Sequence, residues 1–320
     1  MLGIIINPKS GKKAFRAQRL YLWKLLKQRN EPFVYRVTKY ANHASELACE
    51  LVENEGCNRI LVLGGDGTLS EAINGIMSSN LTPQQKSNIK FGLMPRGTGN
   101  DFARHWGLNG DFKRSLNIFF EGYSRPIDVG CVTFQQDNIQ QNRYFINSLG
   151  FGIEPVCCAA AENLKKYIGS HHVNYFFGLV WALFKYKSPH LRLIVDGQTL
   201  LEDRMFVTSV SNGAYVGGGM KLNPQADPCD GVFHSMFLTP PSFKEILLAA
   251  VRLFNGKFHD LSFVHPIVSD NMLLETNQPL SFEADGIVMH VNGPCQVKCM
   301  KHALQIVVPK SFYEKKNKKS

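Results

Sequence analysis

The chain has 320 residues, of which 44% are hydrophobic, enough to bury a core in each of about two domains. This composition excludes a disordered or fibrous protein. Lys and Arg outnumber Asp and Glu by 36 to 26, and the excess lies in residues 9–39 and in the segment after Pro309. Because the remainder is close to neutral, a broad nucleic-acid-binding face is excluded. Two cationic patches suited to phosphates or to an anionic membrane surface are favoured instead.

The N-terminus and the cysteines indicate a cytoplasmic protein. Residues 1–7 lack the cationic lead-in of a secretory signal. The most apolar window, 175–184, is about half as long as the ~20 residues that a helix needs to cross a bilayer. The eight cysteines form no CxxC pair, so we expect reduced thiols rather than disulfides or a metal site.

The first half of the chain alternates short apolar strands with amphipathic helices. This alternation predicts an α/β domain with a parallel sheet. The expected strands are Leu2–Ile6, Phe33–Val37, Arg59–Leu63 and Phe91–Met94, and the expected helices are Lys12–Gln28, Ala44–Asn54, one from about Ser70, and Phe112–Glu121.

In the second half, strands follow one another closely, which predicts an antiparallel β-sandwich. The expected strands are Arg143–Leu149, Leu191–Val195, Arg204–Ser211, Val232–Leu238, Asn271–Glu275, Val288–Val291 and Ala303–Val308, with helices at Pro155–Tyr186 and Phe243–Phe254. We therefore predict a Rossmann-like α/β domain over 1–127, a β-sandwich over 128–309 and a basic flexible tail over 310–320.

Three loops at the ends of predicted strands carry the residues suited to phosphate chemistry. They are Asn7–Gly11, Gly64–Thr68 and Pro95–Phe102. Glycines at a strand-to-helix turn let phosphate oxygens approach backbone N–H groups, and the helix start adds partial positive charge. Asp66 is unusual in such a loop, because its charge repels a phosphate. It either holds Mg²⁺, accepts a proton from an attacking hydroxyl, or simply caps a helix.

The three loops and the motifs of the second half together resemble the diacylglycerol kinase and sphingosine kinase superfamily, and are most similar to its small bacterial lipid kinases. The second-half motifs are Asn147-x-x-Gly150-x-Gly152, Asn212-Gly213-x-Tyr215-x-Gly217-Gly218-Gly219-Met220, Asp230-Gly231 and Glu283-x-Asp285-Gly286. The resemblance covers nearly the whole chain. It implies a nucleotide-binding α/β domain, a C-terminal β-sandwich and an active site in the cleft between them.

The resemblance also implies a role for individual residues in an ATP- and Mg²⁺-dependent transfer of phosphate to a lipid alcohol. The implied nucleotide contacts are Asn7, Pro8, Lys9, Ser10, Gly11, Thr38, Gly64, Gly65, Asp66, Gly67, Thr68, Leu69, Ser70, Glu71 and Thr98. The implied metal ligands are the Asp230 carboxylate with the carbonyls of Asp227 and Val232, and Asp101 and Asp128 as water-bridged contacts. The implied proton acceptor is Asp285.

The main departure from the family pattern is Ile287, which stands where the family commonly has Glu in an Asp-Gly-Glu turn. Either Asp285 or Asp66 must then act as the base, and Asp285 is favoured. Cys229 and His234 stand where acids are common, which predicts weaker metal binding.

Diacylglycerol is the expected acceptor, although the sequence leaves several alternatives open. These are a sphingoid-base kinase, an NAD kinase-like enzyme and a non-catalytic nucleotide-binding regulator. The apolar run 175–184 suits either acyl-chain contact or a core helix. We also expect peripheral contact with an anionic membrane and no nucleic-acid partner, and we leave a homodimer open.

Overall fold

The computed structural model describes residues 1–11, 15–108, 111–159, 186–242, 244–246, 248–249, 252, 258–276 and 278–317. The chain divides into two compact units. Unit 1 comprises residues 1–128 and 302–320, and unit 2 comprises residues 129–301. The chain therefore leaves unit 1 once and returns to it near its C-terminal end.

Unit 1 is built on a parallel sheet with the strand order β2-β1-β3-β4. Its strands are β1 (Leu2–Ile6), β2 (Phe33–Val37), β3 (Arg59–Gly64) and β4 (Lys90–Pro95). Both neighbours of β1 pair with it in parallel, so that Ile6 lies opposite Val37 and Leu63. Every residue of β1 is buried, as expected for a strand covered on both faces.

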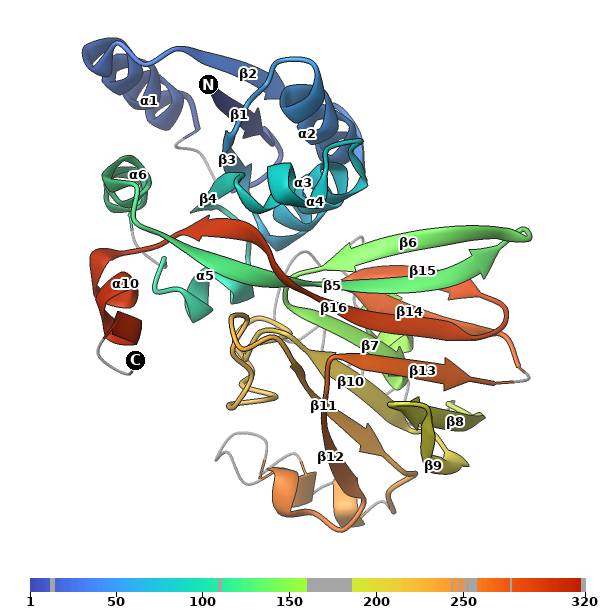
Figure 1. The fold of residues 1–320 in the computed structure, drawn as a ribbon. Helices are drawn as coiled ribbons and strands as arrows, with labels where there is room; N and C mark the ends of the chain where they lie inside the picture. The colour runs from blue at the N-terminus through green and yellow to red at the C-terminus, as the bar shows by residue number, and fades with distance from the viewer. Residues whose placement is uncertain are drawn as a thin grey trace. The chain divides into compact units, whose positions relative to one another are not determined.

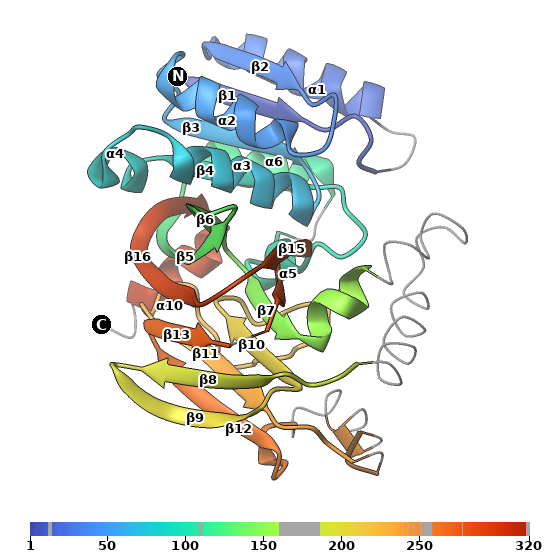
Figure 2. The same ribbon diagram turned by 90° about the vertical axis from the view of Figure 1, so that its right-hand side faces the viewer.

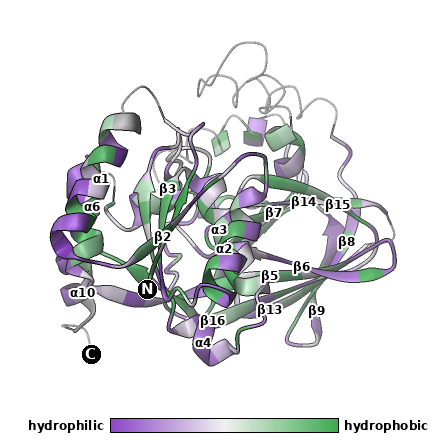
Figure 3. Ribbon diagram, turned by 90° about the horizontal axis from the view of Figure 1, so that it is seen from above, coloured by the Kyte–Doolittle hydropathy of each residue, from purple (hydrophilic) through white to green (hydrophobic). Residues whose placement is uncertain are grey.

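Helices cover both faces of this sheet. They are α1 (Phe15–Arg29), α2 (His43–Glu53), α3 (Asp66–Ser78), α4 (Pro83–Ser87), α5 (Asp101–His105) and α6 (Phe112–Glu121). Figures 1 and 2 show α2 and α3 on one face and α1 and α6 on the other. Leu22 and Leu26 bury the apolar side of α1, and Figure 3 shows polar and apolar residues alternating along this helix. This arrangement confirms the predicted α/β fold of the first half.

The end of the chain completes unit 1. The last residues of β16 (Cys295–Val307) pair in parallel with β4, where Gln305 lies opposite Lys90. Helix α10 (Lys310–Asn317) follows, in the segment where the sequence predicts a flexible tail. This segment is helical rather than flexible because two of its aromatic rings pack against unit 1. Phe312 packs on Trp106, and Tyr313 packs on Tyr123.

Unit 2 is an antiparallel β-sandwich. Its strands are β5 (Ser124–Gln136), β6 (Ile139–Phe145), β7 (Ser148–Gly152), β8 (His190–Val195), β9 (Gln198–Arg204), β10 (Val207–Ser211), β11 (Phe233–Leu238), β12 (Val264–Ser269), β13 (Asn271–Glu275), β14 (Leu280–Ala284), β15 (Ile287–Val291) and β16. The chain enters unit 2 along β5 and leaves it along β16. One sheet has the order β12-β11-β10-β7-β14-β15, and in the other β16, β13, β8 and β9 are neighbours. Residues 153–159 form a helix and Phe258–Asp260 a 3₁₀ turn.

The core of the sandwich lies between the two sheets. Phe151 and Phe282 come from the six-stranded sheet, and Leu193 and Val297 come from the other. The opposite face of the six-stranded sheet carries a second apolar cluster that includes Val207 and Met236. The prediction of an antiparallel sandwich is thus confirmed.

Two predicted helices, and the apolar run that suits either acyl-chain contact or a core helix, fall partly or wholly outside the described residues. Most of Pro155–Tyr186, half of Phe243–Phe254 and the whole apolar run 175–184 lie outside the described residues. Within the residues that are described, no helix combines the length and apolar character needed to cross a bilayer.

Candidate active site

The first loop follows β1 directly and is held by Asn7. The Asn7 backbone N–H donates to the Leu63 carbonyl at 3.0 Å, and its side-chain amide donates to the Thr68 hydroxyl at 2.9 Å. The Asn7 side-chain oxygen accepts the Lys9 N–H at 2.9 Å, which turns the chain. The first loop is therefore tied both to β3 and to the start of α3.

The second and third loops, at the ends of β3 and β4, touch through their backbones. The Arg96 N–H donates to the Gly64 carbonyl at 2.8 Å. A Cβ added to Gly65 would lie 2.8 Å from the Gly97 Cα, which is closer than side chains pack. Within the third loop, Gly97 N–H donates to the Asn100 side-chain oxygen at 2.9 Å, and the Asn100 amide returns a bond to the Gly97 carbonyl. Glycine is thus needed at 65 and 97 for the loops to approach this closely.

The Asp66 carboxylate links the second loop to the third. It accepts the backbone N–H of Asp101 at 3.2 Å and that of Phe102 at 3.4 Å, and so caps the start of α5. The capping role that the sequence left open is therefore present. Asp101 itself is buried, with 7% of its surface exposed.

Other predicted nucleotide contacts of unit 1 lie around these loops in different settings. Thr38 follows β2, and its N–H donates to the Ile6 carbonyl at 2.9 Å. The Glu71 carboxylate caps α2 by accepting the N–H groups of Asn42 and Ala44, a structural role that sequence reasoning did not identify. Pro8, Gly67 and Thr98 are exposed, whereas Thr68, Leu69 and Ser70 are buried in unit 1.

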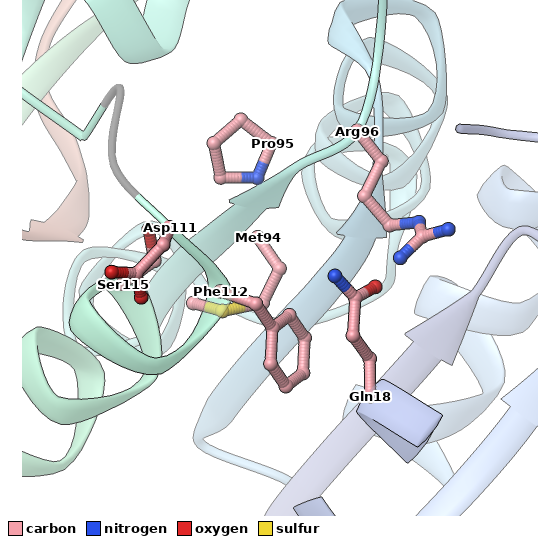
Figure 4. Close-up of a pocket in the computed structure, with 7 residues that line it drawn as sticks. All are labelled: Gln18, Met94, Pro95, Arg96, Asp111, Phe112 and Ser115. Atoms are coloured by element: carbon pink, nitrogen blue, oxygen red, sulfur yellow. The ribbon is translucent and has the colours of Figure 1, made fainter. Parts of the chain in front are cut away.

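A pocket of about 270 Å³ opens beside the third loop in unit 1. Figure 4 shows its lining, in which the Arg96 guanidinium lies near the Gln18 amide of α1. The remaining lining residues are Met94, Pro95, Asp111, Phe112 and Ser115. Arg96 was not among the predicted contacts, although it stands inside the predicted loop. The signal that could have found it is its charge, since no other Lys or Arg lies between Pro95 and Phe102.

Unit 2 carries Asp285, in the turn between β14 and β15. Its Oδ1 accepts the N–H groups of Asn147 and Ser148 at 3.0 and 3.1 Å, and its Oδ2 accepts that of Ile146 at 3.0 Å. Burial raises the pKa of Asp285, and the three hydrogen bonds lower it. Asp285 also adopts a left-handed backbone, with φ of 50°. The three hydrogen bonds therefore hold the turn and the Asp285 carboxylate in one conformation.

Two more carboxyl groups lie inside unit 2 and were not predicted as site residues. Burial raises the pKa of Glu283 to about 8 and, together with the charge of Glu283, raises the pKa of Glu154 well above its ordinary value. Gly150 makes room for the pair, because any side chain there would overlap the Glu154 carboxyl group. Two buried acids this close cannot both ionise easily, so the pair keeps at least one proton at neutral pH.

The candidate metal ligands lie in a short turn of unit 2. Asp230 Oδ1 accepts the Val232 N–H at 3.1 Å, and its Oδ2 lies 2.9 Å from His234 Nε2. The Asp227 carbonyl accepts the Asp230 N–H at 3.2 Å. Among the described residues, no three His, Cys, Asp or Glu side chains gather around one point. One partly exposed carboxylate with neighbouring carbonyls still suits Mg²⁺, which keeps several waters and takes few protein ligands.

Asp128 belongs to unit 1 and accepts the His302 N–H at 2.7 Å. It is fully buried, and this bond ties together the two segments that connect the units. Asp66, Asp101 and the three loops thus lie together in unit 1, whereas Asp285 and the Asp227–Val232 turn belong to unit 2.

Comparison with known proteins covers both halves of the chain. Residues 1–132 match the sequence profile described as the diacylglycerol kinase catalytic domain, and residues 147–308 match the YegS C-terminal NAD kinase beta sandwich-like domain. A diacylglycerol kinase of Staphylococcus aureus strain JH9 is 30% identical over 246 residues, which is 76% of this chain and 72% of that protein.

Two solved structures share the fold. A diacylglycerol kinase from Bacillus anthracis strain Sterne superposes with a TM-score of 0.69 at 18% identity, covering 97% of each chain. An NAD kinase from Archaeoglobus fulgidus in complex with ATP gives a TM-score of 0.53 at 12% identity, covering all of this chain and 98% of its own. Likeness of fold alone does not distinguish the two kinds of kinase, but the sequence matches do. On the matches over both halves of the sequence, the chain belongs to the diacylglycerol kinase family.

Proposed function

We propose that this protein is an ATP-dependent lipid kinase that transfers the γ-phosphate of ATP to the hydroxyl of diacylglycerol, giving phosphatidic acid. The observation that carries the proposal is the convergence of three loops at the carboxyl ends of β1, β3 and β4, with the backbones of Gly65 and Gly97 in contact. In open α/β sheets, ligands bind at this edge. Family membership supplies the reaction class.

The three loops would bind the nucleotide. The exposed residues Pro8, Gly67 and Thr98 leave room for phosphate oxygens, and the start of α3 adds partial positive charge. Leu69 and Ser70 would act by shaping the loop rather than by contact, because their side chains are buried. Glu71 would act by fixing the residues around Asn42, next to the Thr38 segment.

Mg²⁺ would be held by the Asp230 carboxylate with the carbonyls of Asp227 and Val232, and Asp101 and Asp128 are proposed as water-bridged contacts. When bound, the ion would neutralise charge on the transferred phosphate. His234 beside Asp230 supplies no negative charge, so we propose that the ion is held weakly.

Asp285 is proposed as the base. A carboxylate offers about four lone pairs. The three backbone N–H groups use two on Oδ1 and one on Oδ2, which leaves one on Oδ2 for a proton. In the proposed step, the lipid hydroxyl gives its proton to this oxygen while its own oxygen forms a bond to the γ-phosphorus. The bond from that phosphorus to the bridging oxygen of ADP breaks at the same time.

The protein is proposed to meet its lipid at the cytoplasmic surface of an anionic membrane. Exposed Lys24 and Lys27 on α1, together with the basic C-terminal end, would contribute about 1 kcal/mol for each charge near the surface. The membrane contact would raise the local lipid concentration.

The test is transfer of labelled γ-phosphate from ATP in the presence of Mg²⁺, with Asp285→Asn as the control enzyme. The acceptors are diacylglycerol and sphingosine, each in mixed micelles, and NAD in solution. We expect label in phosphatidic acid and none with Asp285→Asn. Label in sphingosine alone would identify a sphingoid base as the acceptor instead of diacylglycerol. Label in NAD alone would show that the acceptor is a dinucleotide rather than a lipid. Label in no acceptor would favour a non-catalytic regulator.

A further inference from the structure

The Arg96 side chain connects the third loop to the first. Its Nε donates to the Ser10 carbonyl at 3.1 Å. Its backbone N–H donates to the Gly64 carbonyl at 2.8 Å. A single residue of the third loop therefore bonds to both of the other loops.

Gly11 makes this contact possible. A Cβ at Gly11 would lie 2.9 Å from a terminal nitrogen of Arg96 and 3.1 Å from its Nε. Gly11 also has φ of 79°, a left-handed conformation that other residues adopt only with strain. The guanidinium therefore packs directly against the glycine backbone, on the same turn whose Ser10 carbonyl it binds.

The contact orients the peptide groups of the first loop. Asn7 holds the start of this loop through the Lys9 N–H and the Thr68 hydroxyl, and Arg96 holds its end through the Ser10 carbonyl. With both ends fixed, the loop N–H groups are directed before any ligand arrives. A preorganised loop loses little conformational entropy when a phosphate binds, so less of the binding free energy is offset.

Arg96 also keeps a positive charge beside the loop. Desolvation lowers its pKa, but a guanidinium remains protonated in proteins. Bonding between a charged group and a carbonyl is stronger than bonding between neutral groups. A glutamine or methionine at this position could not supply the same charge.

We propose that Arg96 is a positioning residue of the nucleotide site, which fixes the Ser10–Gly11 turn so that the first loop can bind the phosphate chain of a nucleoside triphosphate. This inference rests on the proposed ATP-dependent activity. It differs from a packing role for Arg96 at the edge of the pocket in Figure 4, because a packing role would change stability without a selective loss of ATP affinity.

The test compares four forms of the full chain: the wild type, Arg96→Met, Arg96→Lys and Arg104→Met. Arg104 is a matched control, since it is exposed and its guanidinium lies 3.4 Å from the Gly99 carbonyl of the same loop, not from the first loop. The measurements are ATP affinity by calorimetry with Mg²⁺ and without lipid, the thermal unfolding midpoint, and kcat with KM for ATP.

We expect Arg96→Met to weaken ATP binding by about tenfold to a hundredfold, the range for loss of a hydrogen bond from a charged group. KM for ATP should rise by a similar factor, with kcat at saturating ATP and the unfolding midpoint nearly unchanged. Arg96→Lys should recover part of the affinity, because it keeps the charge and a donor. Arg104→Met should bind ATP as the wild type does.

Wild-type affinity in Arg96→Met, or an equal loss in Arg104→Met, would overturn the inference while leaving the proposed function intact. Failure of the wild type to bind ATP would instead overturn the proposed function and the inference with it. If Arg96→Met does not fold, Arg96→Lys decides the matter. A severalfold weaker affinity then supports the inference, and an unchanged affinity refutes it.

Discussion

Replacing Glu283 by Gln should make the stability of the protein less dependent on pH between about 5 and 8. Burial raises the pKa of Glu283 from 4.5 to about 8, so the folded chain binds a proton that the unfolded chain has released over this range. Stability therefore falls as pH rises from the unfolded value towards the folded one. Gln removes the titration and still offers an oxygen to the Gly286 N–H, which donates to Glu283 Oε2 at 2.6 Å.

The size of the effect follows from the number of protons involved. One extra proton in the folded state changes the free energy of unfolding by about 1.4 kcal/mol per pH unit. Between pH 5.5 and 7.5 the wild type should lose up to about 3 kcal/mol that Glu283→Gln keeps. For a unit of this size, that corresponds to roughly 6–12 °C in the unfolding midpoint.

The assay is thermal unfolding of the full chain, followed by far-ultraviolet circular dichroism at several pH values from 5 to 9. Glu202→Gln, on the exposed surface of β9, is the matched control and should follow the wild type. If the curves of the wild type and Glu283→Gln run parallel over this range, Glu283 carries no extra proton in the folded chain and the argument from its burial fails.

Three further substitutions test the site and the fold. Asp285→Asn should lower turnover by roughly 10²–10⁴-fold, the usual worth of a general base, with ATP affinity retained in calorimetry; unchanged turnover would move the base to Asp66. His234→Asp adds a carboxylate beside Asp230 and should lower the Mg²⁺ concentration that gives half-maximal activity, and a higher requirement would argue against the Asp230 turn as the metal site. Gly75→Ala on α3 would place a methyl group against the Ser45 carbonyl oxygen of α2 and should lower the stability of unit 1 by about 1–3 kcal/mol in denaturant unfolding. The control Ser78→Ala, at the exposed end of α3, should change the stability little.

The fold class was accessible from the sequence because local patterns determine it. Continuous apolar strands such as Leu2–Ile6, each followed by a glycine loop and a helix, specify a parallel sheet and place the loops at one edge. The lengths of β5 and β16 were not accessible. Strand β5 pairs with the adjacent β6 but also with the distant β16, and on β16 Gln305 meets Lys90 only once the fold is complete.

The buried acids show a different limit of sequence reasoning. Glu283 stands two residues before Asp285 in what reads as a polar turn, and Glu154 opens a helix, so neither suggests burial. Their proximity depends on strand pairing, because Glu283 lies opposite Gly150 on β7. Gly150 also lies opposite Ser209 on β10, and the missing side chain at 150 leaves the space that the Glu154 carboxyl group occupies.

Asp66 shows why an acidic residue in a glycine loop supports two interpretations. Its carboxylate accepts two N–H groups at the start of α5 and thereby joins the second loop to the third. A helix start with unsatisfied N–H groups requires an acceptor, so this bond accounts for an acid at position 66 without reference to any substrate. Asp285 likewise accepts backbone N–H groups, three in number, and keeps one lone pair on Oδ2 that is suited to accept a proton. Because backbone N–H groups give both carboxylates a structural role, the hydrogen bonds alone do not decide between them, and turnover of Asp285→Asn is the measurement that does.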